Sequence, residues 1–299
     1  MIPHIGPLAS PSFVPQFCRR AEEAGLDGLW AVEHLAVPQT MASAYTLARK
    51  PVVVANEAIR ATMGLNLEML TTLTVAAAVT SRVKLGTSVA VLPLRNAILN
   101  ARQLASLSLY SAGRLLYGVG VGWLEEEAQA MGMAWDRRGA RSDEHIDILR
   151  TLWNAEGEAV SFDGPFTSVP PIDPNPRPAA AIPILVGGHS DAALDRAARL
   201  GDGWIAAFMS PDRVADAMGR LHRACERHQR DPSELWLACG TEIRPDGGTG
   251  GSGESPLDRL ARYEELGIHH AFVRADGPSE AEALGRLDQW GELIAARGA

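Results

Sequence analysis

Residues 192–206, which read AALDRAARLGDGWIA, contain the pattern that decides the fold expected for this chain. A helical run rich in alanine and arginine ends at Gly201, and an apolar strand begins at Trp204. Glycine after a helix accepts the left-handed conformation that closes the last turn. The same pattern recurs where residues 19–25 precede 29–32 and where 257–267 precede 271–273. These stretches indicate units in which a helix leads into a strand.

Short β-rich runs alternate with helical segments along the whole chain. The strands are expected at 2–5, 28–32, 83–92, 115–121, 182–186, 203–207, 235–239 and 271–274, and the helices at 12–25, 68–81, 97–112, 140–154, 190–201, 211–229, 256–267 and 279–297. Eight alternating units predict an α/β protein, a (β/α)8 TIM barrel forming a single domain over residues 1–299. A doubly wound open sheet alternates in the same way, but the number of strands and the chain length favour the barrel.

Two connections are long enough to be insertion loops at the C-terminal face of the barrel. They span residues 33–67, after the second expected strand, and 160–183, before the fifth. Loops of this length are uncommon unless they cover a site. The glycine-rich stretch 246–254 is expected to be a flexible surface excursion.

The composition excludes several classes of function. The chain has 299 residues, 46% of them hydrophobic, and a formal net charge of -8, so it lacks the positive charge expected of a nucleic-acid-binding protein. No stretch is typical of a membrane span or a signal peptide. Cys18, Cys225 and Cys239 lie far apart, without metal or redox spacing. We therefore expect a cytoplasmic protein without a nucleic-acid or membrane partner.

Active sites of this fold use residues at and just beyond the C-terminal ends of the strands. The residues expected there are Glu33 and His34, then 88–93, 118–123, 187–190, Phe208, Met209, Thr241, Glu242 and Asp276. Most are apolar or glycine, and adjacent strand ends show neither the cluster of ligands that a metal needs nor the carboxylate pair of a glycosidase. We expect no metal, and a flat, largely apolar ligand with a small-molecule substrate.

We call the end of the barrel formed by the C-terminal strand ends the mouth. His34 is the titratable group placed most clearly there, where it could donate a proton or a hydrogen bond to a ligand. A single histidine is also a common structural residue. The remaining histidines at 145, 222 and 228 fall within expected helices and are interpreted as surface groups.

Two glycine-rich turns each leave two interpretations open. Gly187, Gly188, His189 and Ser190 run from a strand into a helix and could hold a phosphate on backbone N–H groups, or form a tight turn in which Ser190 caps the helix. The alternating glycines of 118–123 could let a bulky group lie against the strand, or could allow close packing within the barrel.

Taken together, these residues resemble the bacterial-luciferase-like flavin and deazaflavin oxidoreductases, and in particular the branch that uses the deazaflavin coenzyme F420. The resemblance covers nearly the whole chain. The stretches that carry it are 21–30 (AEEAGLDGLW) leading to Glu33 and His34, 82–89 (RVKLGTSV), 113–115 (GRL) with 118–123 (GVGVGW), Arg138 and Gly139 with Glu144, and Gly187 and Gly188 with 198–204 (ARLGDGW).

The resemblance implies a barrel that binds F420, or alternatively FMN, with its ring system at the mouth and its phosphate near residues 187–190. His34 would be the catalytic residue, in contact with the reactive ring. The implied cofactor-binding residues are Glu33, His34, Thr87, Ser88, Val89, Gly120, Val121, Gly122, Gly187, Gly188, His189 and Ser190, and the implied substrate contacts are Trp123, Phe208 and Met209. The family also implies a cis peptide bond between Ser88 and Val89, which would form a bulge beneath the ring.

The resemblance favours an F420-dependent oxidoreductase that transfers hydride between the deazaflavin and a small organic substrate. An FMN-dependent two-component monooxygenase supplied by a separate reductase, and a non-catalytic flavin-binding barrel, remain alternatives. Trp123 stands where sugar-phosphate dehydrogenases of the family carry an acidic residue, so we expect an apolar or aromatic substrate.

Two expectations concern the first strand and the oligomeric state. Relatives usually begin with a longer first strand, so the strand at 2–5 is expected to be short. Ile98, Ala101, Leu104 and Ala105 form an apolar stripe that could join two copies in a homodimer, or could pack on the barrel strands.

Overall fold

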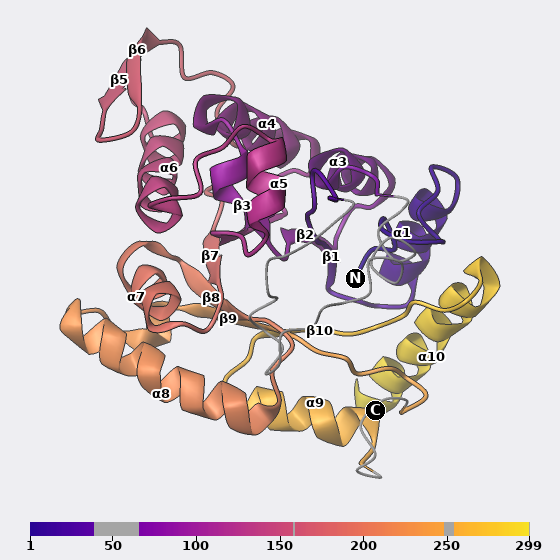
Figure 1. Cartoon of the computed structure of the whole chain (residues 1–299). Coiled ribbons are helices and arrows are strands. Elements are labelled where there is room, and N and C mark those ends of the chain that lie inside the picture. The colour runs from indigo at the N-terminus through magenta and orange to yellow at the C-terminus, as the bar shows by residue number, and fades with distance from the viewer. Residues whose placement is uncertain (39–65, 158, 248–253, 299) are drawn as a thin grey trace.

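Parallel strands form the centre of the molecule and helices surround them (Figure 1). The computed structural model describes residues 1–38, 66–157, 159–247 and 254–298. The sheet has the order β1-β2-β4-β7-β8-β9-β10, and β3 pairs with β4. Its strands are β1 (Gly28–Ala31), β2 (Lys84–Thr87), β3 (Ala90–Val91), β4 (Leu115–Gly120), β7 (Ile184–Gly187), β8 (Gly203–Ala206), β9 (Trp236–Gly240) and β10 (His270–Phe272). The prediction of a (β/α)8 TIM barrel is confirmed, since the parallel strands form a nearly closed barrel.

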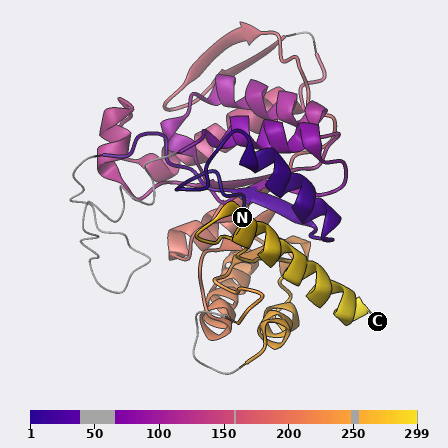
Figure 2. The same cartoon turned by 90° about the vertical axis from the view of Figure 1, so that its right-hand side faces the viewer.

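The helices follow the strands in the expected alternation. They are α1 (Phe13–Glu23), α3 (Met69–Val79), α4 (Ala97–Tyr110), α5 (Glu125–Ala130), α6 (Arg138–Trp153), α7 (Asp191–Leu200), α8 (Pro211–Arg227), α9 (Pro256–Glu265) and α10 (Glu280–Gly298), with short 3-10 turns η1 (Leu92–Leu94) and η2 (Pro232–Glu234). In Figure 2 the helices of the N-terminal half lie on one side of the strands and the orange and yellow helices of the C-terminal half on the other.

Successive side chains of each strand point to opposite faces, which divides the core into two parts. One face fills the inside of the barrel with Trp30, Leu116, Leu185, Ile205, Ala238 and Phe272. The other face packs against the helices in a larger cluster that includes Leu29, Leu85 and Val186. Because the inside is packed with side chains, a ligand must bind at an end of the barrel rather than within it.

The expected first strand is reduced to a few hydrogen bonds between β10 and β1, a place we call the seam. The Ile2 N–H donates to the Trp30 carbonyl at 2.8 Å, and the Met1 amine donates to the Val273 carbonyl at 3.3 Å. Residue Ile5 forms an isolated bridge with Asn66. Residues 2–5 therefore do not form the regular strand that was predicted there.

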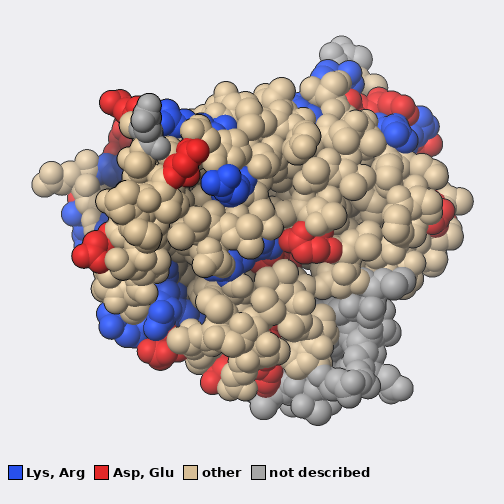
Figure 3. Space-filling view, turned by 90° about the horizontal axis from the view of Figure 1, so that it is seen from above, with Lys and Arg blue, Asp and Glu red and all other residues tan. Residues whose placement is uncertain are grey.

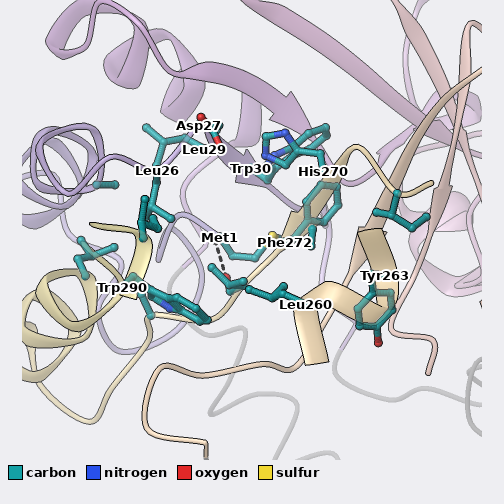
Figure 4. A pocket seen from close by; sticks show the side chains of 18 of the residues that line it. Met1, Leu26, Asp27, Leu29, Trp30, Leu260, Tyr263, His270, Phe272 and Trp290 are labelled. Atoms are coloured by element: carbon teal, nitrogen blue, oxygen red, sulfur yellow. Dashed lines mark hydrogen bonds between the residues drawn. The ribbon is translucent and has the colours of Figure 1, made fainter. Parts of the chain in front are cut away.

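A hollow of about 290 Å³ lies beside the seam, along β1 and β10. The rings of Trp30, His270 and Phe272 meet at one side of it, with Trp290 and Leu260 at another (Figure 4). Its lining includes none of the residues expected at the mouth. This hollow is therefore separate from the candidate site.

The expected strand over 83–92 is divided into β2 and β3 by a cis peptide bond between Ser88 and Val89, the bond that the family resemblance implies. The expected long connection 160–183 contains an antiparallel hairpin of β5 (Val160–Asp163) and β6 (Ser168–Ile172), which projects from the N-terminal half (Figure 1). Most of the connection 33–67 and of the glycine-rich stretch 246–254 lies outside the described residues.

The apolar stripe of α4 faces inward. Ala101, Leu104 and Ala105 are buried against the rest of this chain, which rules them out as a surface for a second copy and supports the alternative of packing on the barrel. The solvent-facing apolar residues of this helix are instead Leu99, Leu109 and Tyr110.

The face seen in Figure 3 is mostly uncharged, and its basic and acidic side chains lie in small neighbouring groups. No helix in the described part of the chain combines the length and the apolar character needed to cross a membrane.

Candidate functional site at the barrel mouth

His34 lies just beyond the end of β1 and contacts two residues that follow β4. Its Nδ1 atom is 3.1 Å from Oε2 of Glu127, and its ring meets the indole of Trp123 edge-on with the centroids 6.0 Å apart. The His34 side chain is 13% exposed. The structure thus brings His34 and Trp123, two of the residues expected from the sequence, together at the mouth.

Glu127 is the residue of this group that the sequence reasoning missed. It lies on α5, its side chain is 3% exposed, and its Oε1 atom accepts hydrogen bonds from the Leu35 N–H at 2.6 Å and the Ala36 N–H at 3.1 Å. Three successive glutamates, 125–127, begin this helix, and such a run is usually solvated. The available signal was the position of the helix, which begins just after the glycines that end β4.

Glu33 is buried and fully engaged inside the protein. One of its oxygens pairs with Arg95, and the other accepts a hydrogen bond from the Val91 N–H at 2.7 Å. Burial raises the pKa of the Glu33 carboxyl, and the neighbouring Arg95 guanidinium opposes that shift. Glu33 therefore connects the end of β1 to β3 and holds the chain immediately after the Ser88–Val89 bend.

The glycines of β4 and β7 make room for the side chain of Val89. An added Cβ on Gly120 would lie 2.7 Å from Cγ2 of Val89, and one on Gly187 would lie 2.7 Å from Cγ1 of the same residue. A Cβ on Gly122 would similarly lie 2.8 Å from Val91. Close packing within the barrel is thus what these glycines provide directly. We call Val89 and its two flanking glycines, Gly120 and Gly187, the mouth floor.

Thr87 and Gly118 fix the adjoining strands just beneath the floor. The Thr87 hydroxyl donates to the Gly118 carbonyl at 2.7 Å, and a Cβ on Gly118 would meet the Thr87 carbonyl oxygen at 2.0 Å. Because neither contact leaves space, Thr87 supports the mouth from below rather than facing it. Val121 and Ser88 are half-buried beside these residues.

The turn 187–190 forms the helix cap, one of the two interpretations left open above, and phosphate binding stays a prediction. Ser190 caps α7, since its hydroxyl accepts a hydrogen bond from the Ala193 N–H at 3.2 Å. Gly188 has a φ of 115°, which favours glycine, and its carbonyl accepts from the Trp204 indole at 2.6 Å. The Nδ1 atom of His189 is buried without a hydrogen-bond partner among the described residues.

Positive charge lies close to this turn. Burial lowers the pKa of His189, and the nearby guanidinium groups of Arg213 and Arg220 lower it further. Arg220 is already paired with Asp191, the first residue of α7. The unsatisfied ring nitrogen, the helix N-terminus and Arg213 together form surroundings that an anionic group such as a phosphate would fit.

Phe208 and Met209 follow β8 and differ in exposure. Phe208 is 43% exposed and has a φ of 49°, a left-handed conformation that is uncommon for a bulky residue. Met209 is 5% exposed, and its carbonyl accepts a hydrogen bond from the Tyr263 hydroxyl at 2.7 Å. Of the two, Phe208 is the one with an apolar ring accessible to a ligand. The described residues contain no group of three or more histidine, cysteine or acidic side chains placed to hold a metal ion.

Comparisons with known proteins agree on one family. The model of the luciferase-like monooxygenases matches residues 3–246. An uncharacterised protein of Mycobacterium tuberculosis (strain ATCC 25618 / H37Rv) is 36% identical over 197 residues, which are 66% of this chain and 63% of that protein. The match therefore spans less than two thirds of that relative's length.

Two solved structures share the fold over nearly the whole chain. The monooxygenase RslO1 from Streptomyces bottropensis has a TM-score of 0.76 at 21% identity, covering 100% of this chain and 98% of that one. An F420-dependent secondary alcohol dehydrogenase, in complex with an F420-acetone adduct, has a TM-score of 0.73 at 16% identity, covering 97% and 96%. At these identities the two structures establish the shared fold.

Proposed function

Because the chain belongs to the luciferase-like monooxygenase family, we propose that it is an F420-dependent oxidoreductase that transfers hydride between the deazaflavin and a small apolar organic substrate. The choice of F420 over FMN rests on the sequence resemblance to the F420-dependent branch of this family.

One observation carries the proposal. The mouth floor, where Val89 lies between Gly120 and Gly187, is formed at the C-terminal strand ends that also carry His34, Trp123 and the buried carboxylate of Glu127. A flat apolar floor beside a single titratable group suits a ligand whose own atoms carry the reaction. The turn 187–190, with its anion-favouring surroundings, supports a place for the phosphate of such a ligand.

The residues present fit a deazaflavin, which when bound would supply the carbon that gives or accepts the hydride. In this proposal Val89 and its neighbouring glycines support the ring, and Gly188, His189 and Ser190 hold the phosphate. Glu33 acts indirectly, by fixing the chain after the Ser88–Val89 bend. His34 holds or moves a proton at Nε2, the ring nitrogen that does not face Glu127. Trp123 and Phe208 exclude water and contact the substrate.

Titration of the purified protein with F420 and with FMN, each followed by its own fluorescence, tests the cofactor. We expect saturable binding of F420 with an affinity at least about tenfold higher than that of FMN, a difference of about 1.4 kcal/mol. Oxidation of reduced F420 is then measured against a panel of ketones, enones, quinones and nitroaromatic compounds. Binding of FMN alone, or of neither compound, would contradict the proposal.

Phe208 offers a prediction that separates binding from stability. Phe208→Ala and Phe208→Gly both remove the exposed ring and are expected to raise KM for an apolar substrate about tenfold, because roughly half of a phenylalanine's burial is lost. The glycine variant is expected to be more stable than the alanine variant by about 1 kcal/mol, because the φ of 49° strains any residue with a Cβ.

The measurements are thermal unfolding of both variants and steady-state kinetics on the best substrate of the panel. Equal melting temperatures would show that the left-handed conformation is not maintained in solution. An unchanged KM in both variants would remove Phe208 from the substrate contacts.

A further inference from the structure

Glu127 is a buried carboxylate that bonds to three consecutive residues beyond β1. Its oxygens contact the ring of His34 and the backbone N–H groups of Leu35 and Ala36. A carboxylate with a 3% exposed side chain is costly to bury unless its oxygens accept hydrogen bonds. Here Oε1 accepts two backbone N–H groups, and Oε2 lies within hydrogen-bond distance of Nδ1 of His34.

The bond directions determine where the proton of His34 lies. Backbone N–H groups only donate, so Oε1 of Glu127 is an acceptor for Leu35 and Ala36. An ionised carboxylate has no proton to give, so Oε2 is also an acceptor, and Nδ1 of His34 must carry the hydrogen. In the neutral imidazole the other ring nitrogen, Nε2, then presents its lone pair.

We propose that Glu127 is the positioning residue of the site: it holds the proton of His34 on Nδ1, so that Nε2 is the atom that accepts or returns a proton at the mouth. The consequence for catalysis rests on the function proposed above, whereas the position of the proton does not.

Glu127 could have the purely structural role of holding the backbone at Leu35 and Ala36, which would use the same two hydrogen bonds. The test must therefore separate this anchoring from the placement of the proton on His34. Glu127→Gln makes this separation. Its amide oxygen is expected to remain at the Oε1 position, because two N–H donors face that point and would repel an amide NH₂. The NH₂ group then faces Nδ1 of His34 and donates to it. The neutral ring must move its proton to Nε2.

Nitrogen NMR of the ligand-free protein with ¹⁵N-labelled histidine measures this change directly. The His34 signals are assigned by their loss in His34→Ala. In the wild-type protein at a pH where the ring is neutral, we expect Nδ1 to be the protonated nitrogen and Nε2 the unprotonated one. In Glu127→Gln we expect the two assignments to be exchanged.

Glu125→Gln is the matched control, since it removes one charge from the same helix and its side chain contacts Gln129 rather than His34. It is expected to leave the wild-type pattern in place. A wild-type ring protonated on Nε2, or an unchanged pattern in Glu127→Gln, would overturn the proposal. The wild-type spectrum alone is sufficient for this test if the variant does not fold.

Kinetics test the catalytic consequence separately. Glu127→Gln is expected to lower kcat about 10- to 100-fold, as for groups that orient a ligating or catalytic histidine, while the Kd for F420 changes by less than about twofold. An exchanged NMR pattern with an unchanged kcat would overturn the positioning role. A protein that binds no F420 would reject the proposed function, and the NMR result would still decide where Glu127 holds the proton.

Discussion

His34→Ala is expected to lower kcat by about 10²- to 10⁴-fold, the range that a positioned acid or base contributes. The ring of His34 lies at the mouth, and its hydrogen-bond partner among the described residues is Glu127, which faces Nδ1. Removing the ring leaves the floor, the turn 187–190 and Trp123 in place, so F420 binding is expected to weaken much less than turnover. The measurement is kcat for oxidation of reduced F420 on the best substrate found.

Two further measurements make this result specific. The melting temperature of His34→Ala is expected to fall modestly, because the side chain is only 13% exposed and its loss leaves Oε2 of the buried Glu127 without this partner, so the Kd for F420 of the folded variant is measured beside kcat. His228→Ala is the control, since that histidine caps α8 and bonds Asp195 far along the chain. A kcat that His34→Ala leaves unchanged, or that His228→Ala lowers equally, would eliminate the assigned role.

Gly120→Ala is expected to lower kcat/KM by about 10²-fold and to destabilise the protein by about 1–3 kcal/mol. The new methyl group would lie 2.7 Å from Cγ2 of Val89, closer than any relaxed contact, so Val89 must move from its place between Gly120 and Gly187. Val89 is β-branched and cannot rotate freely out of the way. The floor is therefore displaced, and a ring resting on it is displaced too.

A second substitution shows whether Val89 is the cause. With Val89→Ala added, the nearest atom to the new methyl group would be Cβ of residue 89, at the ordinary distance of 3.8 Å. The double variant is therefore expected to regain melting temperature and F420 affinity relative to Gly120→Ala. Gly285→Ala, at an exposed helix position with no atom within 4 Å of the added Cβ, should be neutral or slightly stabilising. If the double variant does not recover melting temperature and F420 affinity, the losses in Gly120→Ala do not arise from the contact between the new methyl group and Val89.

The sequence predicted the barrel well because each unit carries its own local signals. Glycine follows α1, α7 and α9 as expected; Gly25 and Gly267 have positive φ, whereas Gly201 ends α7 with an extended backbone at a φ of -83°. The serine before α7 and α9 and the apolar strands likewise depend on residues near one another in the chain. The rule that sites lie at the C-terminal strand ends then placed His34, Val89 and the turn 187–190 on the same edge. The family resemblance supplied the cis bond at Ser88, which no local pattern indicated.

What the sequence could not supply were contacts between distant segments. Glu127 and His34 are 93 positions apart, and nothing near either residue distinguishes Glu127 from Glu125 and Glu126. His145 was wrongly interpreted as a surface group: it is buried, its Nε2 lies 3.1 Å from Nδ2 of Asn100, and burial lowers its pKa to about 4. A helix pattern shows that a histidine is on a helix but not which neighbouring helix covers it.

The seam between β1 and β10 is the junction of the barrel that is held by the fewest backbone hydrogen bonds between strands. Every other pair of neighbouring strands in the sheet is joined by a regular ladder, whereas β1 and β10 are connected through the Met1 amine and the Ile2 N–H. Local opening of the barrel is therefore expected to begin between these two strands, where few hydrogen bonds must break.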